Sequence, residues 1–268
     1  MHVAEAGPSD GQPIVLLHGW PQHWYEWRGL VPELSRHYRM VMPDLRGLGW
    51  TDAPADGYEK ENLARDVVKL LDALELERVK LIGHDWGGYV RFLLGLLEPT
   101  RVERFVALNI IHPWPSRSPA RFLQFWRMAY QLPLIAPLVG PHMTRTPLFK
   151  RSLRRATKGA LSEAELEAFA APLREPARAR ASASYYRSFQ FHDLPLLARG
   201  HWRQYRLAAP TLMLHGTGDV VIQPSFLSGY EPYADDMRVE FVEGTGHFIA
   251  DIAPALVARR ALEFFAAR

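Results

Sequence analysis

Short apolar runs alternate with stretches of helical periodicity along much of the chain. Buried strands are predicted where β-branched and aliphatic residues cluster, at 14–17, 39–43, 79–83 and 104–109. Between these runs, apolar residues recur every three or four positions over 63–74, and 89–97 is apolar on nearly every side. Strands that alternate with helices predict an α/β fold, in which helices flank a mostly parallel, twisted sheet on both faces.

A long helical insertion interrupts this alternation. Residues 113–199 form aromatic-rich helical stretches punctuated by prolines, without a strand-like run of comparable quality. Afterwards the earlier pattern returns, with predicted strands at 210–215 and 237–242 and a helix over 254–265. We therefore expect one α/β core, made of residues 1–112 and 200–268, with residues 113–199 inserted as a helical cap, or lid.

Composition narrows the classes of protein further. The 268 residues include no cysteine, which excludes a disulfide framework, thiol catalysis and cysteine-based metal sites. No apolar run approaches the roughly 20 residues of a membrane span, and the first residues show no basic segment followed by an apolar one. A soluble, cytoplasmic protein is expected. The 32 basic and 29 acidic residues give a net charge of +3, too small a field to favour nucleic-acid binding.

The most informative motif reads GHDWGG over residues 83–88. It lies where a predicted strand ends and a predicted helix begins. This is the layout of a nucleophile elbow, a tight turn that presents one side chain at the carboxyl edge of a sheet. Gly83 and Gly87 remove side chains that would collide in such a turn. The residue at its apex is Asp85, where the serine hydrolases have serine.

An aspartate at this position indicates displacement at a saturated carbon. A serine that attacked such a carbon would form an ether, which has no carbonyl group for water to attack and would not be hydrolysed. A carboxylate forms an alkyl ester instead, and an activated water can open that ester at the Asp85 carbonyl. The alternative is that Asp85 only caps the following helix, and the partners described next argue against it.

A histidine and a second acid stand where such a nucleophile needs them. His247 lies in a glycine-flanked loop directly after the last predicted strand, and Asp219 follows the strand at 210–215. The three residues thus occur in the order nucleophile, acid, histidine, which is the chain order of enzymes that have a nucleophile elbow. We expect His247 to deprotonate a water as general base, and Asp219 to hold its tautomer and stabilise the imidazolium. The alternative for Asp219 is an aspartate of a surface turn.

Hydrolysis of the ester also requires donors for the oxyanion that forms on Asp85. One is expected to be the main-chain amide of Trp86, the residue after the nucleophile. The other is expected to be the amide of Trp20, in the loop that follows the strand at 14–17. The segment GPSDG at 7–11 matches the serine form of the elbow in its letters only, because it precedes a strand rather than a helix.

Taken together, these segments resemble the α/β-hydrolase fold family, and within it the epoxide hydrolases. The similar segments extend over almost the whole chain and read HGWP at 18–21, WYEWR at 24–28, DLRGLG at 44–49 and GHDWGG at 83–88, followed by Asp219 and GH at 246–247. The insertion resembles the helical cap of those enzymes. The resemblance also implies a strand over residues 2–6, ahead of the first run described above.

The resemblance implies two cap tyrosines whose hydroxyls hold and protonate the epoxide oxygen. A phenol, with a pKa of about 10, can protonate the alkoxide that ring opening releases. Segments 127–132 and 184–188 are similar to the two motifs, so the roles fall on Tyr130 and Tyr186, with Tyr186 preferred over Tyr185. For both, an aromatic that fills the interface between cap and core is the alternative. The expected substrate contacts are Trp20, Trp86, Tyr185 and Phe189.

The implied activity is hydrolysis of a small hydrophobic epoxide to a vicinal diol, with water as co-substrate and no metal or organic cofactor; a homodimer stays open. The nearest rival is a haloalkane dehalogenase, which uses the same Asp–His–Asp core and holds a halide with indole or amide N–H groups. Trp86 would fit that role, but that family leads one to expect asparagine where Trp20 stands and no paired cap tyrosines. A non-catalytic binding protein on this scaffold is disfavoured by the intact nucleophile, base and acid.

Overall fold

The structure, a computed structural model, describes residues 1–115 and 131–267. Within these residues one sheet is formed by β1 (Val3–Ala6), β2 (Pro13–Leu17), β3 (Arg39–Pro43), β4 (Val79–His84), β5 (Val102–Leu108), β6 (Thr211–Gly216) and β7 (Met237–Val242). The strand order is β1-β3-β2-β4-β5-β6-β7, with β1 antiparallel to β3 and the other pairs parallel. The mostly parallel sheet predicted from the sequence is confirmed, and the strand implied over residues 2–6 is β1 at its edge.

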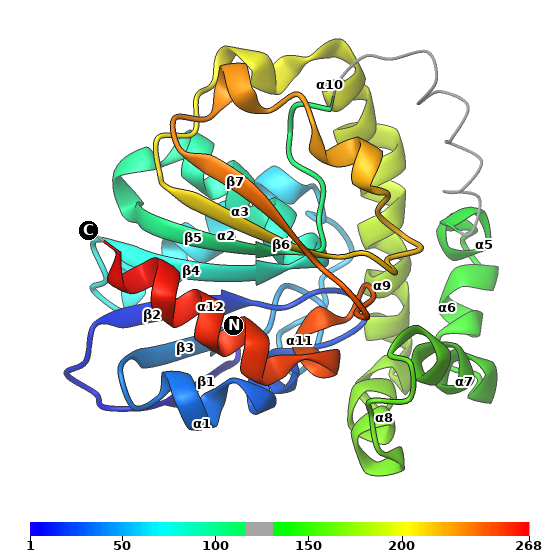
Figure 1. Cartoon of the computed structure of the whole chain (residues 1–268). Coiled ribbons are helices and arrows are strands. Elements are labelled where there is room, and N and C mark those ends of the chain that lie inside the picture. The colour runs from blue at the N-terminus through cyan, green and yellow to red at the C-terminus, as the bar shows by residue number, and fades with distance from the viewer. Residues whose placement is uncertain (116–130, 268) are drawn as a thin grey trace.

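Helices cover both faces of the sheet and make up most of the described part of the insertion between β5 and β6 (Figure 1). Those outside the insertion are α1 (Val31–Leu34), α2 (Lys60–Ala73), α3 (Asp85–Leu97), α11 (Ile249–Ile252) and α12 (Pro254–Ala266). The insertion holds α5 (Gln131–Ile135), α6 (Val139–Met143), α7 (Pro147–Ala156), α8 (Glu163–Ala170), α9 (Pro176–Ser188) and α10 (Leu194–Arg199). The described residues of the insertion, 113–115 and 131–199, contain no strand, as the sequence predicts.

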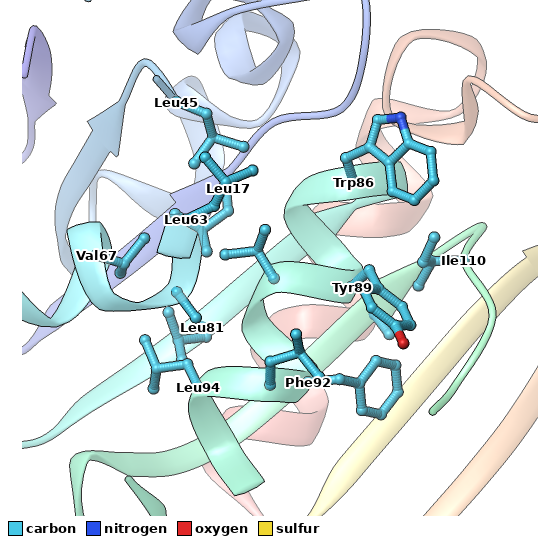
Figure 2. Close-up of a cluster of buried hydrophobic side chains, with 14 of the residues drawn as sticks. Leu17, Leu45, Leu63, Val67, Leu81, Trp86, Tyr89, Phe92, Leu94 and Ile110 are labelled. Atoms are coloured by element: carbon cyan, nitrogen blue, oxygen red, sulfur yellow. The ribbon is translucent and has the colours of Figure 1, made fainter. Parts of the chain in front are cut away.

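The pleat of the central strands divides the core into two layers. Alternate residues of a strand point to opposite faces. Val15 and Leu17 of β2 therefore pack in the layer of α2 and α3, whereas Ile14 and Leu16 pack in the layer of α1 and α12. Figure 2 shows the first layer, in which Leu63 of α2 lies close to Leu17. Because both layers are buried, the sheet is a rigid platform for side chains at its carboxyl edge.

Helix α9 brings the insertion to the carboxyl ends of the strands (Figure 1). The indole Nε1 of Trp20 donates a hydrogen bond to the Ser182 hydroxyl at 2.5 Å, and the Tyr185 hydroxyl donates to the carbonyl of Arg46 at 2.8 Å. Trp20 and Arg46 belong to the loops that follow β2 and β3, so α9 is fastened over the edge where these strands end. None of the helices described is both long enough and apolar enough to cross a lipid bilayer.

Candidate active site

Asp85 stands at the sharp turn between β4 and α3. Its backbone φ is +45°, in the left-handed region that residues other than glycine rarely adopt. The turn needs glycine nearby, because a Cβ on Gly87 would collide with the carbonyl oxygen of Leu17 and a Cβ on Gly83 would lie 2.8 Å from Cα of Gly88. Helix α3 begins at Asp85 itself, whereas apolar periodicity alone predicts only 89–97. Gly87 and Gly88 have a low helix propensity, but they allow the first turn of α3 to pack closely against the backbone of β2 and β4. This close packing outweighs the propensity.

The structure brings the predicted nucleophile, base and acid together. His247 follows β7 and Asp219 follows β6, and these strands are neighbours in the sheet. Nδ1 of His247 lies 2.9 Å from Oδ2 of Asp219, which is hydrogen-bonding distance. Nε2 of the same ring lies 3.7 Å from Oδ1 of Asp85, a contact between charges rather than a hydrogen bond. All three residues are buried.

The second oxygen of Asp85 is held by the loop after β2. The main-chain amide of Trp20 donates a hydrogen bond to Oδ2 of Asp85 at 3.0 Å. The peptide bond from Trp20 to Pro21 is cis. Strand β2 lies next to β4 in the sheet, so the loop and the turn reach the same edge. The two carboxylate oxygens of Asp85 are thus distinguished: Oδ2 faces an amide donor and Oδ1 faces the imidazole.

Electrostatics favour two carboxylates with an imidazolium between them. Burial works against the charged form of Asp85, but the nearby charges of His247 and His84, with the Trp20 amide, hold its pKa below the ordinary value. Burial likewise opposes protonation of His247, yet Asp219 and Asp85 raise its pKa well above the usual range. The pKa of Asp219 is strongly lowered, because the charge of His247 outweighs burial. Among the described residues, no group of three or more His, Asp and Glu side chains is arranged to hold a metal ion.

Aromatic rings lie together beside this group. The ring of Tyr186, on α9, stands edge-on to Trp20 with centroids 4.9 Å apart, and edge-on to Trp86 at 5.7 Å. Phe189 adds a further ring 4.8 Å from that of Trp86. The main-chain amide of Trp20 is hydrogen-bonded to Asp85, and Trp86 is the next residue in the chain. These rings therefore form an apolar wall beside the carboxylate. The predicted contacts Trp20, Trp86 and Phe189 are therefore assembled in one place, together with Tyr186.

Tyr185 points elsewhere. Its hydroxyl donates to the Arg46 carbonyl at 2.8 Å, and its ring packs 5.6 Å from that of Tyr58, with no exposed surface. The expectation that Tyr185 contacts the substrate is corrected by this placement, because its hydroxyl is committed to the interface with the core. The structure thus favours Tyr186 of the two neighbours. The other predicted phenol, Tyr130, lies outside the described residues.

Comparison with protein families settles the membership of the chain. A family model described as the alpha/beta hydrolase fold matches residues 12–254. The chain belongs to the α/β-hydrolase fold family. The match extends from the segment that enters β2 to the beginning of α12, and therefore includes the turn at Asp85 and the loops that carry Asp219 and His247.

Within this α/β-hydrolase family, many of the similar proteins carry the name of an epoxide hydrolase, and others carry more general names, such as "AB hydrolase superfamily protein YfhM" of Bacillus subtilis (strain 168). The "Soluble epoxide hydrolase" of Corynebacterium sp. (strain C12) is 32% identical, over 99% of this chain and 93% of that protein. The human protein named "Epoxide hydrolase 4" is 29% identical, over 96% of this chain and 73% of that protein. A solved structure, "Epoxide hydrolase CorEH without ligand", matches with a TM-score of 0.85 at 29% identity, over 99% of this chain and 94% of that one. The chain is thus an epoxide hydrolase-like α/β-hydrolase.

Sequence reasoning missed one residue of this α/β-hydrolase site, Asn109. It follows β5, is fully buried and has a φ of +43°. Its Nδ2 donates to Oδ2 of Asp219 at 2.7 Å, while its Oδ1 accepts from the amide of Gly216 at 3.4 Å. The available signal was its position at the carboxyl end of a strand between β4 and β6. The periodicity predicts Asn109 only as the last residue of a strand.

Proposed function

We propose that this α/β-hydrolase converts an epoxide to a vicinal diol through a covalent ester on Asp85. The observation that carries the proposal is a carboxylate, rather than a hydroxyl, at the apex of the turn and 3.7 Å from Nε2 of His247. A carboxylate is a suitable nucleophile for a saturated carbon, because the ester that it forms can be hydrolysed. The names of the similar proteins support epoxides as the substrate class.

The first step is attack by Oδ1 of Asp85 on an epoxide carbon. Oδ2 is held by the Trp20 amide, where it can remain as the carbonyl oxygen of the ester, so Oδ1 is the oxygen left for attack. The bond between that carbon and the epoxide oxygen breaks, and the oxygen takes a proton from a phenol. The contacts of the Tyr186 ring with Trp20 and Trp86 support this residue as the phenol, and the family resemblance implies Tyr130 as its partner.

The second step is hydrolysis of the ester by a water that His247 activates. Esterification neutralises Asp85 and removes one of the two carboxylates that keep the imidazole protonated, so the pKa of His247 falls and the ring becomes a competent base. His247 then takes a proton from water, and the hydroxide attacks Cγ of the ester. The amides of Trp20 and Trp86 receive the oxyanion. Collapse breaks the bond between Cγ and Oδ1, His247 gives its proton to Oδ1, and Oδ1 leaves as a hydroxyl of the diol.

The proposed core and the proposed cap contribute different residues to the site. The core, residues 1–112 and 200–268, supplies Asp85, Asp219 and His247, and the helical cap, residues 113–199, supplies Tyr186 and Phe189. The rings of Trp20, Trp86, Tyr186 and Phe189 make an apolar surface, which suits a small hydrophobic epoxide.

One observation supports haloalkane dehalogenation as a second candidate. The indole Nε1 of Trp86 is buried and has no hydrogen-bond partner among the described residues, so it could donate to a departing halide. Trp20 offers no second indole donor, because its Nε1 donates to Ser182. A panel of hydrophobic epoxides assayed for diol, with haloalkanes assayed in parallel for halide, separates the two. Diol without halide supports the proposal, and halide without diol contradicts it.

Tyr186→Phe should lower kcat/KM for epoxide opening by about 10²-fold, because the epoxide oxygen loses a proton donor. The neighbouring Tyr185→Phe is the matched control. It removes the hydroxyl of another buried tyrosine, whose partner is the Arg46 carbonyl, so it should reduce thermal stability but leave kcat/KM within about twofold. Steady-state kinetics of diol formation check both variants. Equal losses in the two variants would contradict the assignment of Tyr186.

Asn109→Ala should lower kcat by about tenfold and lower KM with it, because the base acts in hydrolysis of the ester and slower hydrolysis lets the ester accumulate. The substitution deletes a donor to the Asp219 carboxylate, and a hydrogen bond to a charged group is worth about 1.5–3 kcal/mol. Asp219 keeps the amides of Val221 and Ile222 on its other oxygen, so it should stay in place but orient His247 less firmly. Steady-state kinetics, with circular dichroism as a folding control, give the result. An unchanged kcat would remove Asn109 from the site.

A further inference from the structure

A buried ion pair lies directly beside the proposed nucleophile. His84 is the last residue of β4, and Glu26 lies in the 3-10 helix η1 (Trp24–Gly29). Oε1 of Glu26 is 2.8 Å from Nδ1 of His84, and neither side chain has any exposed surface. The mechanism proposed above gives neither residue a role.

Each member of the pair also holds a main-chain group of the site. Oε2 of Glu26 accepts a hydrogen bond from the amide of Gly19 at 2.9 Å, one residue before Trp20. Nε2 of His84 lies 2.9 Å from the main-chain carbonyl oxygen of His247. A carbonyl oxygen can only accept, so Nε2 of His84 must carry a hydrogen. The pair therefore connects the loop that donates to Asp85 with the loop that carries the base.

The charges of the pair follow from these contacts. Nε2 carries a hydrogen toward the carbonyl, and Nδ1 faces a carboxylate, so the stable state of His84 is an imidazolium. Burial opposes that charge, but Glu26 outweighs it and the pKa of His84 is raised. The space around the pair is tight as well, since a Cβ on Gly19 would lie 2.7 Å from Nδ1 of His84 and 2.7 Å from Cβ of Asp85.

Stability alone is a poor reason for such a pair. Two charges taken out of water lose hydration, and a buried ion pair is often no more stabilising than apolar side chains of similar volume. The pair is, however, well suited to fix geometry. It joins three segments that meet at Asp85: the loop after β2, the end of β4 and the loop after β7.

We propose that Glu26 and His84 are positioning residues, which hold the Gly19 amide and the His247 carbonyl so that the Trp20 amide and the His247 ring meet Asp85 in register. The inference rests on the proposed function, because it concerns the two steps of that reaction. The Trp20 amide and the His247 ring, which are placed by those two main-chain groups, both act in hydrolysis of the ester: the amide on the oxyanion and the ring on the water. Alkylation needs only that Asp85 be presented to the epoxide. Hydrolysis should therefore be the step more sensitive to loss of the pair.

His84→Phe tests this difference between the two steps. We expect kcat to fall by about 10²-fold, comparable to the loss of one oxyanion donor. KM should fall with it, because slow hydrolysis allows the ester to accumulate, so that kcat/KM changes by less than about threefold. Intact-mass measurement during turnover should show most of the protein carrying the mass of the epoxide. Glu26→Ala should give the same signature and replaces His84→Phe if that variant does not fold.

Two further variants serve as controls. Glu26→Gln keeps an acceptor for the Gly19 amide and offers an N–H to Nδ1 of a neutral His84, so it should recover kcat to within about tenfold of the wild type. Lys80→Met breaks a partly buried ion pair on the same strand, β4, where Nζ lies 2.7 Å from Oε1 of Glu103. Lys80 lies at the opposite end of β4 from His84, so this variant should lose thermal stability without a change in kcat or KM.

Two results would overturn the positioning role. One is an unchanged kcat in His84→Phe and Glu26→Ala. The other is a lower kcat at constant KM that matches the loss of folded protein, as a purely structural role requires. If the wild type itself makes no diol from any epoxide, the proposed function has failed, and nitrogen NMR of the histidines then tests the pair. A doubly protonated His84 in the wild type and a singly protonated one in Glu26→Gln support it, and a neutral His84 in the wild type overturns it.

Discussion

Replacing Asp85 with alanine should abolish diol formation while the protein still folds. The carboxylate is the atom group that bonds to the substrate, so its loss leaves the aromatic wall, the phenol and the base with no nucleophile to assist. In enzymes that work through a covalent intermediate, removal of the nucleophile costs orders of magnitude, and we expect kcat to fall by at least about 10⁴-fold. Steady-state diol formation, with thermal unfolding as the folding control, measures this.

The same variant has an electrostatic consequence that checks the site without turnover. Two carboxylates, Asp219 and Asp85, raise the pKa of His247 against the effect of burial. With Asp85 gone, only one remains, so the pKa of His247 should move down toward its ordinary range. An NMR titration of the imidazole reports this shift. Retained diol formation in Asp85→Ala would remove Asp85 from the role of nucleophile, and an unmoved pKa would show that the carboxylate does not face the ring.

Replacing His247 with glutamine should separate the two steps of the reaction. Alkylation uses Asp85 and a phenol, and neither is altered, so the epoxide should still open on the enzyme. Hydrolysis needs a base to take a proton from water, and a glutamine amide cannot accept that proton. The variant should therefore make one equivalent of ester and then stop. Intact-mass spectrometry should show the protein heavier by the mass of the substrate.

Peptide mapping then locates the bound substrate. The added mass should fall on the peptide that contains Asp85, and Asp85→Ala combined with His247→Gln should show no addition. An unmodified protein after incubation with a substrate of the wild type would argue against the covalent route. Modification of a different carboxylate, such as Asp219, would exchange the roles of the two acids.

Local sequence signals were sufficient to predict the sheet and the turn at Asp85. Apolar runs of strand length coincide with strands because buried parallel strands have no polar face. Gly83 and Gly87 reveal the turn because another side chain there would collide with neighbouring backbone. Asp219 and His247 could be placed near Asp85 because each follows a strand, and the carboxyl ends of parallel strands share one edge of the sheet.

Long-range contacts were beyond reach of the same reasoning. Asn109 donates to a carboxylate 110 residues further along the chain, and no local pattern announces such a partner. The pair Glu26 and His84 depends in the same way on how the loop after β2 folds against β4. Such partners are specified by packing of whole elements rather than by periodicity.

The choice between Tyr185 and Tyr186 shows a different limit. Neighbouring residues of a helix point about 100° apart, so only one of the two can face Asp85. Both are buried, at 0% and 4% exposure, because α9 is covered on more than one side. Hydrophobic pattern therefore could not tell them apart, and family resemblance supplied the preference. The hydrogen bond from Tyr185 to Arg46 accounts for the orientation of the pair.

The central claim is that the Asp85 carboxylate becomes bonded to the substrate carbon, and single turnover in oxygen-18 water tests it most directly. With enzyme in excess over epoxide, water should attack Cγ of the ester. The first diol formed should then carry the unlabelled oxygen of Asp85, and the heavy oxygen should appear in the peptide that contains Asp85. Labelled diol with an unlabelled peptide would mean that water attacks the epoxide directly, and would contradict the account.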